Sequence, residues 1–543
     1  MSHSIQCRDA LIAFATNLDT GQPSNCAIHR RHPQGVPLHL RIDNCTDCVS
    51  AARWPDADFI VGNPPFIGNK RMRSTLGNNY CEALRAAYPE LPESCDLAMY
   101  FWHKAAELAR SGAIRGFGFI TTNSITQVFS RKVVAMHLAA TPPLHLAFAV
   151  PDHPWVDASD GAAVRIAMTV CQAGSGMGTL STVTAETESP GREVQVTTTE
   201  RRGVINANLT VGADVSSVKP LRANADVACR GVTPVGRGFV VTKQEARKLG
   251  LGCVPGLEKH IRPVRNGKDI TDKPRGAVII DLHGLEEDDV QKRFPNVYQW
   301  LLQTVKPTRD RVRRAGHRNH WWVFGEPRKT LRAALVGLSR YIVTVYVSKH
   351  RFFLFLPQDI LPDDGLVAIA SDDAYHLGVL SSRFHVAWSL AVGGALEDRP
   401  SYNNSVCFST FPFPTPSPQQ QQRIRDLGER LDAHRKTRMA LHPDLTMTAM
   451  YNVLAALRAG RALSVKEKGV EEKGLVGILR ELHDELDEAV AEAYGWSASL
   501  GDEEILVRLV ALNQHRAREE QQGVVQWLRV PSHTPTSLML LLP

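Results

Sequence analysis

The chain has 543 residues, of which 43% are hydrophobic and 22% are charged, and its formal net charge is +7. This composition is typical of globular proteins and excludes collagen-like, mucin-like and wholly disordered classes. The length predicts about three domains, whose cores need no disulfide bonds. Few cysteines, no signal peptide and no membrane-length apolar run predict a reduced, cytoplasmic protein.

The positive charge is concentrated in the middle of the chain. Residues 226–420 contain 27 Lys and Arg against 19 Asp and Glu, a net charge of +8. This excess is larger than that of the whole chain, so the flanking regions together are close to neutral. A basic region between neutral flanks predicts a surface for polyanions such as nucleic acid.

The first part of the chain alternates apolar strands with a helix. Residues 1–12 predict a short strand with a polar exit at Asp9, and residues 58–62 predict a compact apolar strand. An apolar stripe over residues 96–110 predicts a helix that Gly112 ends. Further strands are predicted in the apolar runs 117–121, 144–150 and 164–171. This alternation predicts an α/β sheet.

The rest of the chain divides by composition. Residues 172–225 are rich in Gly, Thr and Ser and predict a hairpin tip at Gly174–Gly178 followed by a linker, while residues 341–347 and 352–356 predict strands. A Pro- and Gln-rich stretch, 412–422, predicts a boundary, beyond which the pattern is helical up to Gly495. The predicted domains are residues 1–225, 226–420 and 421–543.

The strongest chemical signal is the run from Gly62 to Phe66, Gly-Asn-Pro-Pro-Phe, at the end of an apolar strand. Consecutive prolines donate no backbone hydrogen bonds and leave carbonyls as free acceptors. The Asn63 side chain adds an acceptor and Phe66 adds a stacking face. These groups suit a planar base whose amino hydrogens must be accepted. The alternative for a bare Pro-Pro pair is a turn that ends a strand.

This run resembles the catalytic motif of amino-methylating DNA methyltransferases. The wider pattern resembles the MmeI-like group (type IIG/IIL), which are single-chain restriction–modification enzymes that methylate adenine. The similarity runs in order along nearly the whole chain. The segments that carry it are residues 59–68 with 70–73, 118–124, 402–405 with 411–414, 482–487, 493–496 and 527–529.

The resemblance implies a fold, a cofactor and a set of roles. The fold is a class I S-adenosylmethionine-dependent methyltransferase sheet, followed by a mixed α/β target recognition domain and a helical C-terminal region. Asn63 and the Pro64 carbonyl would accept hydrogen bonds from a flipped adenine in double-stranded DNA, with Pro65 between them and Phe66 stacked on the base. Asp9 would contact the adenine of S-adenosylmethionine; taken alone, it is a strand-exit or N-cap residue.

The chain also departs from the family pattern. The Gly-rich loop that holds the methionine part of the cofactor, the ribose-binding acid and a nuclease motif all lie upstream of the position that corresponds to Asp9. We therefore expect a partial sheet without its first strands, and a partner polypeptide that supplies the missing elements. Two alternatives stay open: one half of a split enzyme, and a catalytically inactive DNA-binding remnant.

Two groups of basic residues are candidate DNA contacts, although a solvated surface is the alternative for both. One group lies just beyond the motif and consists of Lys70, Arg71 and Arg73. The other lies in the basic middle region, largely in the dense run 306–318 that precedes Trp321 and Trp322. It consists of Arg309, Arg311, Arg313, Arg314 and Arg318, with Lys349 and Arg351 further along.

Cysteine and histidine spacing offers one weak metal signal. Cys26 and His29, followed by Cys45 and Cys48, have the spacing of a zinc knuckle. Free cysteines in irregular loops are the alternative, and the resembling family needs no metal here. The sequence therefore predicts no metal ligand and leaves zinc binding by these four residues open.

Overall fold

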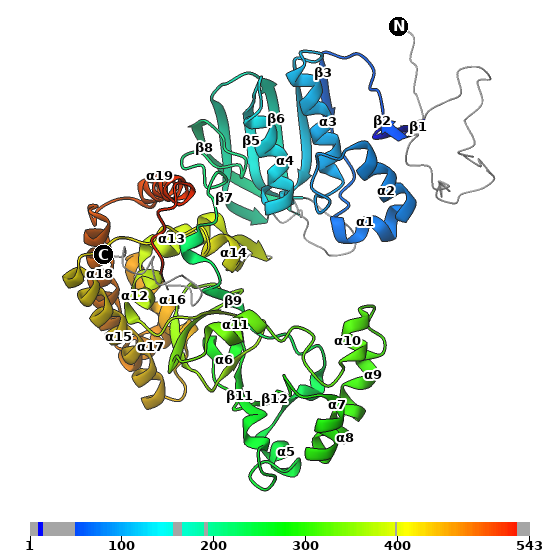
Figure 1. Cartoon of the computed structure of the whole chain (residues 1–543). Coiled ribbons are helices and arrows are strands. Elements are labelled where there is room, and N and C mark those ends of the chain that lie inside the picture. Colours follow the sequence, from blue (N-terminus) through cyan, green and yellow to red (C-terminus); the bar gives the residue numbers. More distant parts are fainter. Residues whose placement is uncertain (1–8, 15–48, 156–164, 189–193, 397–398, 529–543) are drawn as a thin grey trace. The chain divides into compact units, whose positions relative to one another are not determined.

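The computed structural model describes residues 9–14, 49–155, 165–188, 194–396 and 399–528 (Figure 1). The chain forms two compact units, Met1–Ser217 and Val218–Pro543. Cys26, His29, Cys45 and Cys48 lie outside the described residues. No helix in the described part is long and apolar enough to cross a membrane.

The first unit contains the predicted α/β sheet. Its strand order is β3-β4-β6-β5-β7-β8, with parallel pairs β3–β4 and β5–β7 and antiparallel pairs elsewhere. The strands are β3 (Phe59–Gly62), β4 (Gly116–Thr122), β5 (Leu144–Pro154), β6 (Arg165–Ala173), β7 (Gly178–Glu188) and β8 (Val194–Gly203). The α/β class inferred from the sequence is confirmed.

Helices α3 (Ala98–Arg110) and α4 (Val128–Leu138) pack on this sheet (Figure 1). Leu97, Tyr100 and Ala105 of the predicted stripe are buried, while Phe101 and Leu108 are half-buried. The Trp102 indole, which lies outside that stripe, is fully buried and donates a hydrogen bond to Thr169 Oγ1 on β6 at 3.2 Å. Gly112 follows α3 with a φ of 76°, a left-handed conformation that glycine adopts without strain. The helix therefore ends where the sequence predicted.

The expected hairpin tip is wrong, and the expected linker over residues 172–225 is wrong where the chain forms β7 and β8. The part beyond β8 contains the boundary between the two units, after Ser217. Gly174 to Met177 form a turn, but β6 and β7 are not paired, because β7 crosses over to lie beside β5. β7 and β8 then form an antiparallel pair along their whole length. Threonine and valine favour β-strands. An edge strand is largely exposed, however, and its polar, Thr-rich sequence is similar to that of a linker.

β3 is the other edge of the sheet, as the expected partial sheet without its first strands implies. Within the described residues it pairs with β4 alone. Phe59 is 55% exposed and Val61 is 86% exposed, although apolar strands of this kind are usually buried in parallel sheets. An apolar strand with an open edge is a surface on which another strand pairs.

Short elements lie beside the sheet in the first unit. β1 (Ile12–Phe14) and β2 (Val49–Ala51) form an antiparallel pair, so the strand near the start of the chain follows Asp9 instead of ending there. α1 (Asn69–Leu76) and α2 (Asn78–Ala87) separate β3 from α3, and α2 contacts both short strands.

The second unit has two four-stranded sheets. One has the order β10-β12-β11-β15 and the other β14-β13-β16-β9. The strands are β9 (Ala228–Arg230), β10 (Val240–Val241), β11 (Ile261–Arg265), β12 (Val278–Ile280), β13 (Arg340–Val345), β14 (Leu354–Pro357), β15 (Leu361–Pro362) and β16 (Leu366–Ile369). β13 and β14 confirm the two strands that the sequence predicted in this region. A separate pair, β17 (Gly394–Leu396) and β18 (Arg399–Ser401), lies further along.

Small helices surround the first of these sheets. Trp321 and Trp322 are in its core, together with residues of β11 and β12, so these rings pack the domain and are not surface aromatics. The helices are α5 (Lys243–Lys248), α6 (Gly267–Thr271), α7 (Glu287–Arg293), α8 (Pro295–Thr304), α9 (Lys306–Arg309), α10 (Ala315–Asn319) and α11 (Lys329–Ala334).

The C-terminal part is helical, as predicted, and Gly495 ends α18 in a left-handed conformation. Its long helix α15 begins with a capping box between Ser417 and Gln420 at the Pro- and Gln-rich boundary. The helices are α12 (Ala374–Ser381), α13 (Arg383–Val392), α14 (Asn404–Cys407), α15 (Pro418–Leu441), α16 (Met447–Arg458), α17 (Val465–Gly474), α18 (Val476–Tyr494) and α19 (Asp502–Gln521).

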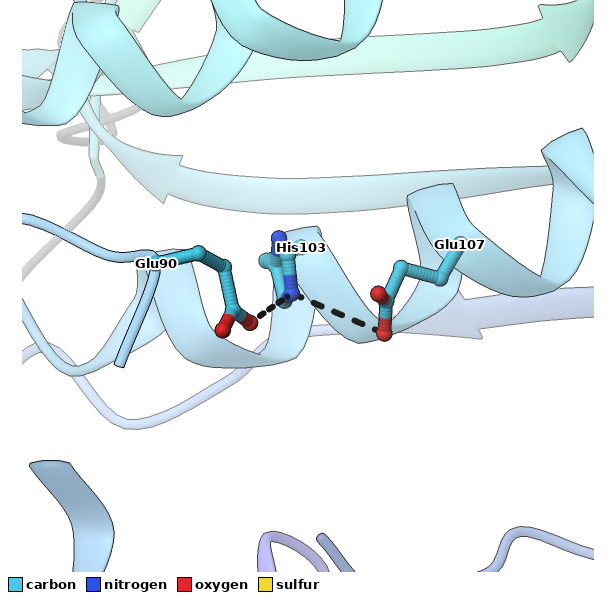
Figure 2. Close-up of side chains that lie close together, drawn as sticks. All are labelled: Glu90, His103 and Glu107. Carbon is cyan, nitrogen blue, oxygen red and sulfur yellow. Dashed lines mark ion pairs between the residues drawn. The ribbon is translucent and has the colours of Figure 1, made fainter. Parts of the chain in front are cut away.

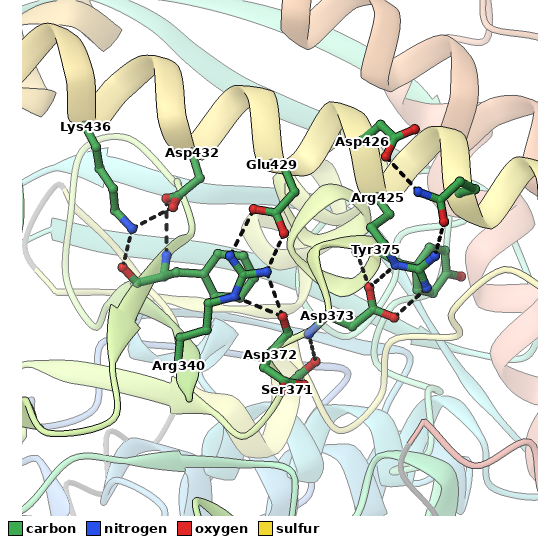
Figure 3. Close-up of polar contacts among 12 residues, drawn as sticks. Arg340, Ser371, Asp372, Asp373, Tyr375, Arg425, Asp426, Glu429, Asp432 and Lys436 are labelled. Carbon is green, nitrogen blue, oxygen red and sulfur yellow. Dashed lines mark hydrogen bonds and ion pairs between the residues drawn. The ribbon is translucent and has the colours of Figure 1, made fainter. Parts of the chain in front are cut away.

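Charged pairs join α15 to the second sheet of this unit (Figure 3). Arg340 on β13 forms a two-pronged ion pair with Glu429, and Arg425 forms another with Asp373 at 2.7 and 2.8 Å. The Asp432 carboxylate accepts a hydrogen bond from the backbone of Phe355 in β14. The helical region and the sheet are thus one packed body.

Candidate functional site

The Asn63–Phe66 run lies at the carboxyl edge of the first sheet. β3 and β4 are parallel, so the residues that follow each strand meet at the same edge. β3 ends at Gly62, where a Cβ atom would lie 2.8 Å from Cε1 of the buried Phe119 ring. Only glycine fits there without moving that ring. The close packing of β3 on β4 therefore fixes where the motif loop begins.

The residues of the motif loop differ in their exposure. Pro64 is buried, Asn63 and Pro65 are exposed, and Phe66 is half-buried. The Ile67 backbone N–H donates to the Pro65 carbonyl at 2.9 Å, so one of the two proline carbonyls closes a tight turn. Among the described residues no hydrogen bond reaches the Pro64 carbonyl. The role of Asn63 and Pro64 as the two acceptors stays a prediction, with which this unpaired carbonyl is compatible.

Asp96, which the sequence reading did not identify as a site residue, holds the end of this loop. Its Oδ1 accepts a hydrogen bond from the Asn69 backbone at 2.9 Å, and its Oδ2 accepts one from Ser124 Oγ at 2.5 Å. The Leu97 N–H also donates to the Ile67 carbonyl at 3.0 Å. The chain before α3 therefore joins the motif loop to the residues that follow β4.

A second aromatic ring, Trp155, stands beside the motif. β5 also ends at the carboxyl edge. Its pairing with β6 is irregular between Val150 and His153, near this end. Trp155 follows directly, and its ring lies edge-to-face with Phe66 at a centroid distance of 6.3 Å. It is 39% exposed. Because the predicted strand ended at residue 150, this tryptophan was not identified as a site residue. The signal that could have indicated it was an aromatic residue just beyond the end of a strand.

Polar groups surround these rings on the same edge. The Asn123 amide donates to Asp152 Oδ1 at 3.2 Å, and the same oxygen accepts from Arg165 Nε at 2.6 Å. Arg165 also donates to Glu186 at 2.7 Å. These bonds join the ends of β4, β5, β6 and β7 and make the edge a fixed frame.

Asp9, the predicted cofactor contact, lies next to the short strand pair. Its Oδ1 accepts hydrogen bonds from the backbones of Leu11 and Ile12 at 2.8 and 3.0 Å, so it forms a turn that leads into β1 and is neither the strand exit nor the helix N-cap considered for it. The Tyr80 hydroxyl donates to the same oxygen at 3.4 Å. Burial, together with the Asp9 carboxylate, raises the pKa of Tyr80, which therefore stays a neutral donor.

The basic residues beyond the motif are on helix α1. Lys70, Arg71 and Arg73 are exposed, while Met72 between them is buried and anchors the helix. Arg73 forms an ion pair with Glu82 on α2 at 2.6 Å. Lys70 and Arg71 therefore present their charge more freely than Arg73 does.

Two predicted DNA contacts in the basic middle region are corrected by the structure. Arg309 is fully buried and donates to the carbonyls of Pro234, His317 and Val323. Arg351 is also buried and donates to the carbonyls of Val345 and Pro400. A count of charges along a sequence cannot separate such structural arginines from surface ones.

The other basic candidates are closer to the surface. Arg311, Arg313 and Arg314 are exposed, and Arg314 pairs with Glu326 at 3.0 Å. Arg318 is half-buried and donates to the carbonyls of Val312 and Arg313, so it shapes the loop that presents the exposed arginines. Lys349 is exposed and donates to Asn452 at 2.9 Å.

Comparison with known proteins gives matches to both units. Residues 37–179 match the family model described as the MmeI DNA-methyltransferase domain, and residues 215–415 match that of the MmeI target recognition domain. Together the two models cover more than half of the chain. The chain belongs to the MmeI family.

Individual proteins are also similar to this chain. DNA methyltransferase A of Bacillus subtilis (strain 168) is 22% identical over 405 residues, which are 71% of this chain and 43% of that protein. The structure of the type IIL restriction–modification enzyme MmeI in complex with DNA has a similar fold. Its TM-score is 0.63 at 20% identity, over 85% of this chain and 57% of that one. The chain spans about half the length of these relatives.

Proposed function

We propose that this MmeI-family chain is the methyl-transfer and recognition part of an adenine-specific DNA methyltransferase of a restriction–modification system. The observation that carries the proposal is the Asn63–Phe66 loop at the carboxyl edge of the sheet, with a free Pro64 carbonyl and two aromatic rings beside it. The methyltransferase and target recognition matches support it, as does the name of the Bacillus subtilis relative.

The chemistry follows from the acceptors. The lone pair of an adenine amino nitrogen is delocalised into its ring, which makes it a poor nucleophile. Asn63 Oδ1 and the Pro64 carbonyl would each accept one amino hydrogen and favour the tetrahedral, nucleophilic form. S-adenosylmethionine supplies the electrophilic methyl group when bound. The amino nitrogen would take this methyl group as the sulfur–methyl bond breaks and S-adenosylhomocysteine leaves, and the resulting cationic amine would lose a proton to water, so no tuned general base is required.

The target base must leave the duplex for this reaction. Flipping costs a few kcal/mol, which stacking on aromatic rings offsets. Phe66 is positioned to stack on one face of the base. Trp155, at 6.3 Å and edge-on in this structure, is placed to approach the other face after a rotation of its side chain. We propose Trp155 as a second stacking residue of this site.

The exposed arginines of the second unit supply contacts to the duplex in this proposal. Arg311, Arg313 and Arg314 lie on and beside a loop that Arg318 holds by backbone hydrogen bonds. Positive charges at such positions bind phosphates and fix the register of a protein on DNA. Lys70 and Arg71 would do the same next to the motif.

Cofactor binding is the less complete part of the site. Asp9 offers a carboxylate, but its Oδ1 already accepts three hydrogen bonds. The open edge of β3, with Phe59 and Val61 exposed, favours a second candidate: a split enzyme in which another polypeptide pairs with this strand and supplies the Gly-rich loop. In that case the chain alone binds S-adenosylmethionine weakly.

One experiment tests both candidates. The purified chain, alone and mixed with the N-terminal half of MmeI, is titrated calorimetrically with S-adenosylmethionine and assayed on DNA by mass spectrometry of nucleosides. We expect weak cofactor binding alone, and N6-methyladenine only in the complemented sample. Micromolar binding and turnover by the chain alone would exclude the split enzyme. DNA binding without methylation in either sample would favour a non-catalytic remnant.

A further inference from the structure

A cluster of three side chains on α3 and the preceding turn is not used by the proposed reaction (Figure 2). His103 and Glu107 are four residues apart on α3, so they share a face of the helix. Glu90 comes from the turn between α2 and α3, where the Leu91 N–H donates to the Tyr88 carbonyl at 3.2 Å. The ligand atoms of the three side chains all lie within 4.8 Å of one another.

The centre of the cluster is the Nε2 atom of His103. It lies 2.7 Å from Glu90 Oε1 and 3.5 Å from Glu107 Oε2. The imidazole is 98% buried, since its exposed fraction is 2%. Nevertheless Nε2 has no hydrogen-bond partner among the described residues, because the nearby carboxylate oxygens do not lie where an N–H would point.

The opposite nitrogen of the ring is already engaged. Nδ1 of His103 lies 2.9 Å from Nε2 of His137, which is also buried. If this short contact holds a proton on His103 Nδ1, then Nε2 keeps its lone pair. That lone pair then lies beside two carboxylates, and a bound cation would neutralise the carboxylates and accept the lone pair. A metal-bound histidine has this tautomer, with its other ring nitrogen donating to a neighbour.

The carboxylates are only partly compensated by other groups. Within the described residues, the ion pairs of Glu90 and of Glu107 are with His103. Lys104, the next residue on α3, places its ammonium 5.5 Å from the centroid of the Trp54 ring and interacts electrostatically with Glu107. The side chains of Glu90 and Glu107 are 41% and 54% exposed, so an ion and its water ligands have access from solvent.

We propose that Glu90, His103 and Glu107 form a binding site for a divalent transition-metal ion, of which Zn²⁺ is the best fit. One imidazole nitrogen and two carboxylate oxygens balance the charge of such an ion and leave room for water. The ion would be structural: it would fix the α2–α3 turn to α3. Tyr88 in that turn donates to the Leu11 carbonyl at 2.7 Å, so the ion would also steady the segment beside Asp9.

Co²⁺ is the probe for the test, because its visible absorption reports the ligands. The full chain is titrated with Co²⁺, and thermal unfolding is followed with and without Zn²⁺. We expect one bound ion per chain with a spectrum of nitrogen and oxygen ligands, and a rise in Tm of at least about 3 °C on addition of Zn²⁺. Glu107→Gln and Glu90→Gln should each weaken binding at least tenfold, whereas Glu93→Gln, in the same turn and 79% exposed, should not.

The cysteines outside the described residues provide the competing outcome. A thiolate charge-transfer band in the near ultraviolet, or binding that persists unchanged in Glu90→Gln and Glu107→Gln, would assign the metal to Cys26, His29, Cys45 and Cys48 and overturn the proposal. So would an absence of stoichiometric binding. Both glutamates are at the surface, and a normal Tm of the metal-free variants confirms that they are folded.

Discussion

Asp96 and Ser124 are hydrogen-bonded across the carboxyl edge of the first sheet, and this bond joins the residues after β4 to the loop after β3. The second carboxylate oxygen of Asp96 holds the backbone of Asn69. The position of the acceptors in the Asn63–Phe66 loop thus depends on a side chain that contacts neither the base nor the cofactor in the proposed reaction.

Asp96→Asn should therefore lower kcat more than it raises KM for DNA. The amide keeps the size of the side chain but loses one acceptor, and a hydrogen bond to a charged group contributes about 1.5–3 kcal/mol. A tenfold or larger fall in single-turnover methylation by the complemented enzyme is expected, with DNA affinity within threefold. Asp56→Asn, exposed before β3, is the control. Equal changes in kcat and KM would argue against a positioning role.

Asn63→Ala should abolish methylation while specific DNA binding stays largely intact. The change removes one of the two acceptors for the amino group and touches no groove contact. Methylation is measured in the complemented enzyme by mass spectrometry, and binding by mobility shift. Asn296→Ala, on the exposed surface of α8, is the matched control. Activity that survives within tenfold would end the catalytic assignment of this loop.

Phe66→Ala and Trp155→Ala should each weaken the capture of the flipped base. Stacking on an aromatic ring contributes about 1–3 kcal/mol per base, so a loss of roughly 5- to 150-fold in methylation is expected. DNA with 2-aminopurine at the target position reports flipping by its fluorescence. We expect a smaller signal with either variant. A normal signal with Trp155→Ala would limit stacking to Phe66.

Replacement of Arg311, Arg313 and Arg314 by Gln should flatten the salt dependence of DNA binding. Each lost phosphate contact reduces the slope of log affinity against log salt by about 0.9. A variant with Lys466, Lys468 and Arg480 changed to Gln has the same net charge and serves as control. An unchanged slope in the first variant would place the DNA surface elsewhere, with Lys349 the next candidate.

The stability of the second unit should fall in mild acid. Burial lowers the pKa of His385 to about 3, and its Nε2 lies 2.9 Å from the Tyr402 hydroxyl. The unfolded chain takes up a proton near pH 6.5, but the folded chain does not. The stabilisation is therefore complete above that pH and is lost as the pH falls, by about 1.4 kcal/mol at pH 5.5. Urea unfolding of the wild type and of His385→Asn measures it.

The His385→Asn variant tests whether His385 causes the loss of stability in mild acid. His385→Asn should be less stable at pH 7.5 but show a shallower loss of unfolding free energy between pH 7.5 and 5.5. His515→Asn, on the exposed surface of α19, controls for the substitution itself. Parallel pH profiles for the wild type and His385→Asn would show that other groups cause the acid sensitivity.

Local patterns predicted much of this fold. The apolar run before Asn63, the stripe on α3 and the glycines at 112 and 495 each specify a strand or a helix end through nearby residues alone. β7 and β8 were not predicted, because polar, Thr-rich edge strands differ little from a linker until their partners are known. The edge position of β3 depends on long-range pairing and has no local signal.

The candidate site divides in the same way. Asn63 to Phe66 are contiguous, so their spacing alone indicated their chemistry. Asp96 and Trp155 join the site only through the sheet, which brings together the ends of three strands. Arg309 and Arg351 have the charge of a DNA contact but their environment is the protein core, and burial is a property of the fold that a count of charges does not include.

The ion pairs between α15 and the second sheet of the C-terminal unit also constrain protein engineering. A chimera that exchanges the target recognition segment at residue 420 would keep Glu429 and Arg425 of one parent and take their partners Arg340 and Asp373 from the other. Mismatched pairs would leave charges uncompensated at the junction. A transplant that extends through the end of α15 carries Arg340 and Glu429, and Asp373 and Arg425, as matched sets, and should therefore yield more soluble hybrids with new sequence specificity.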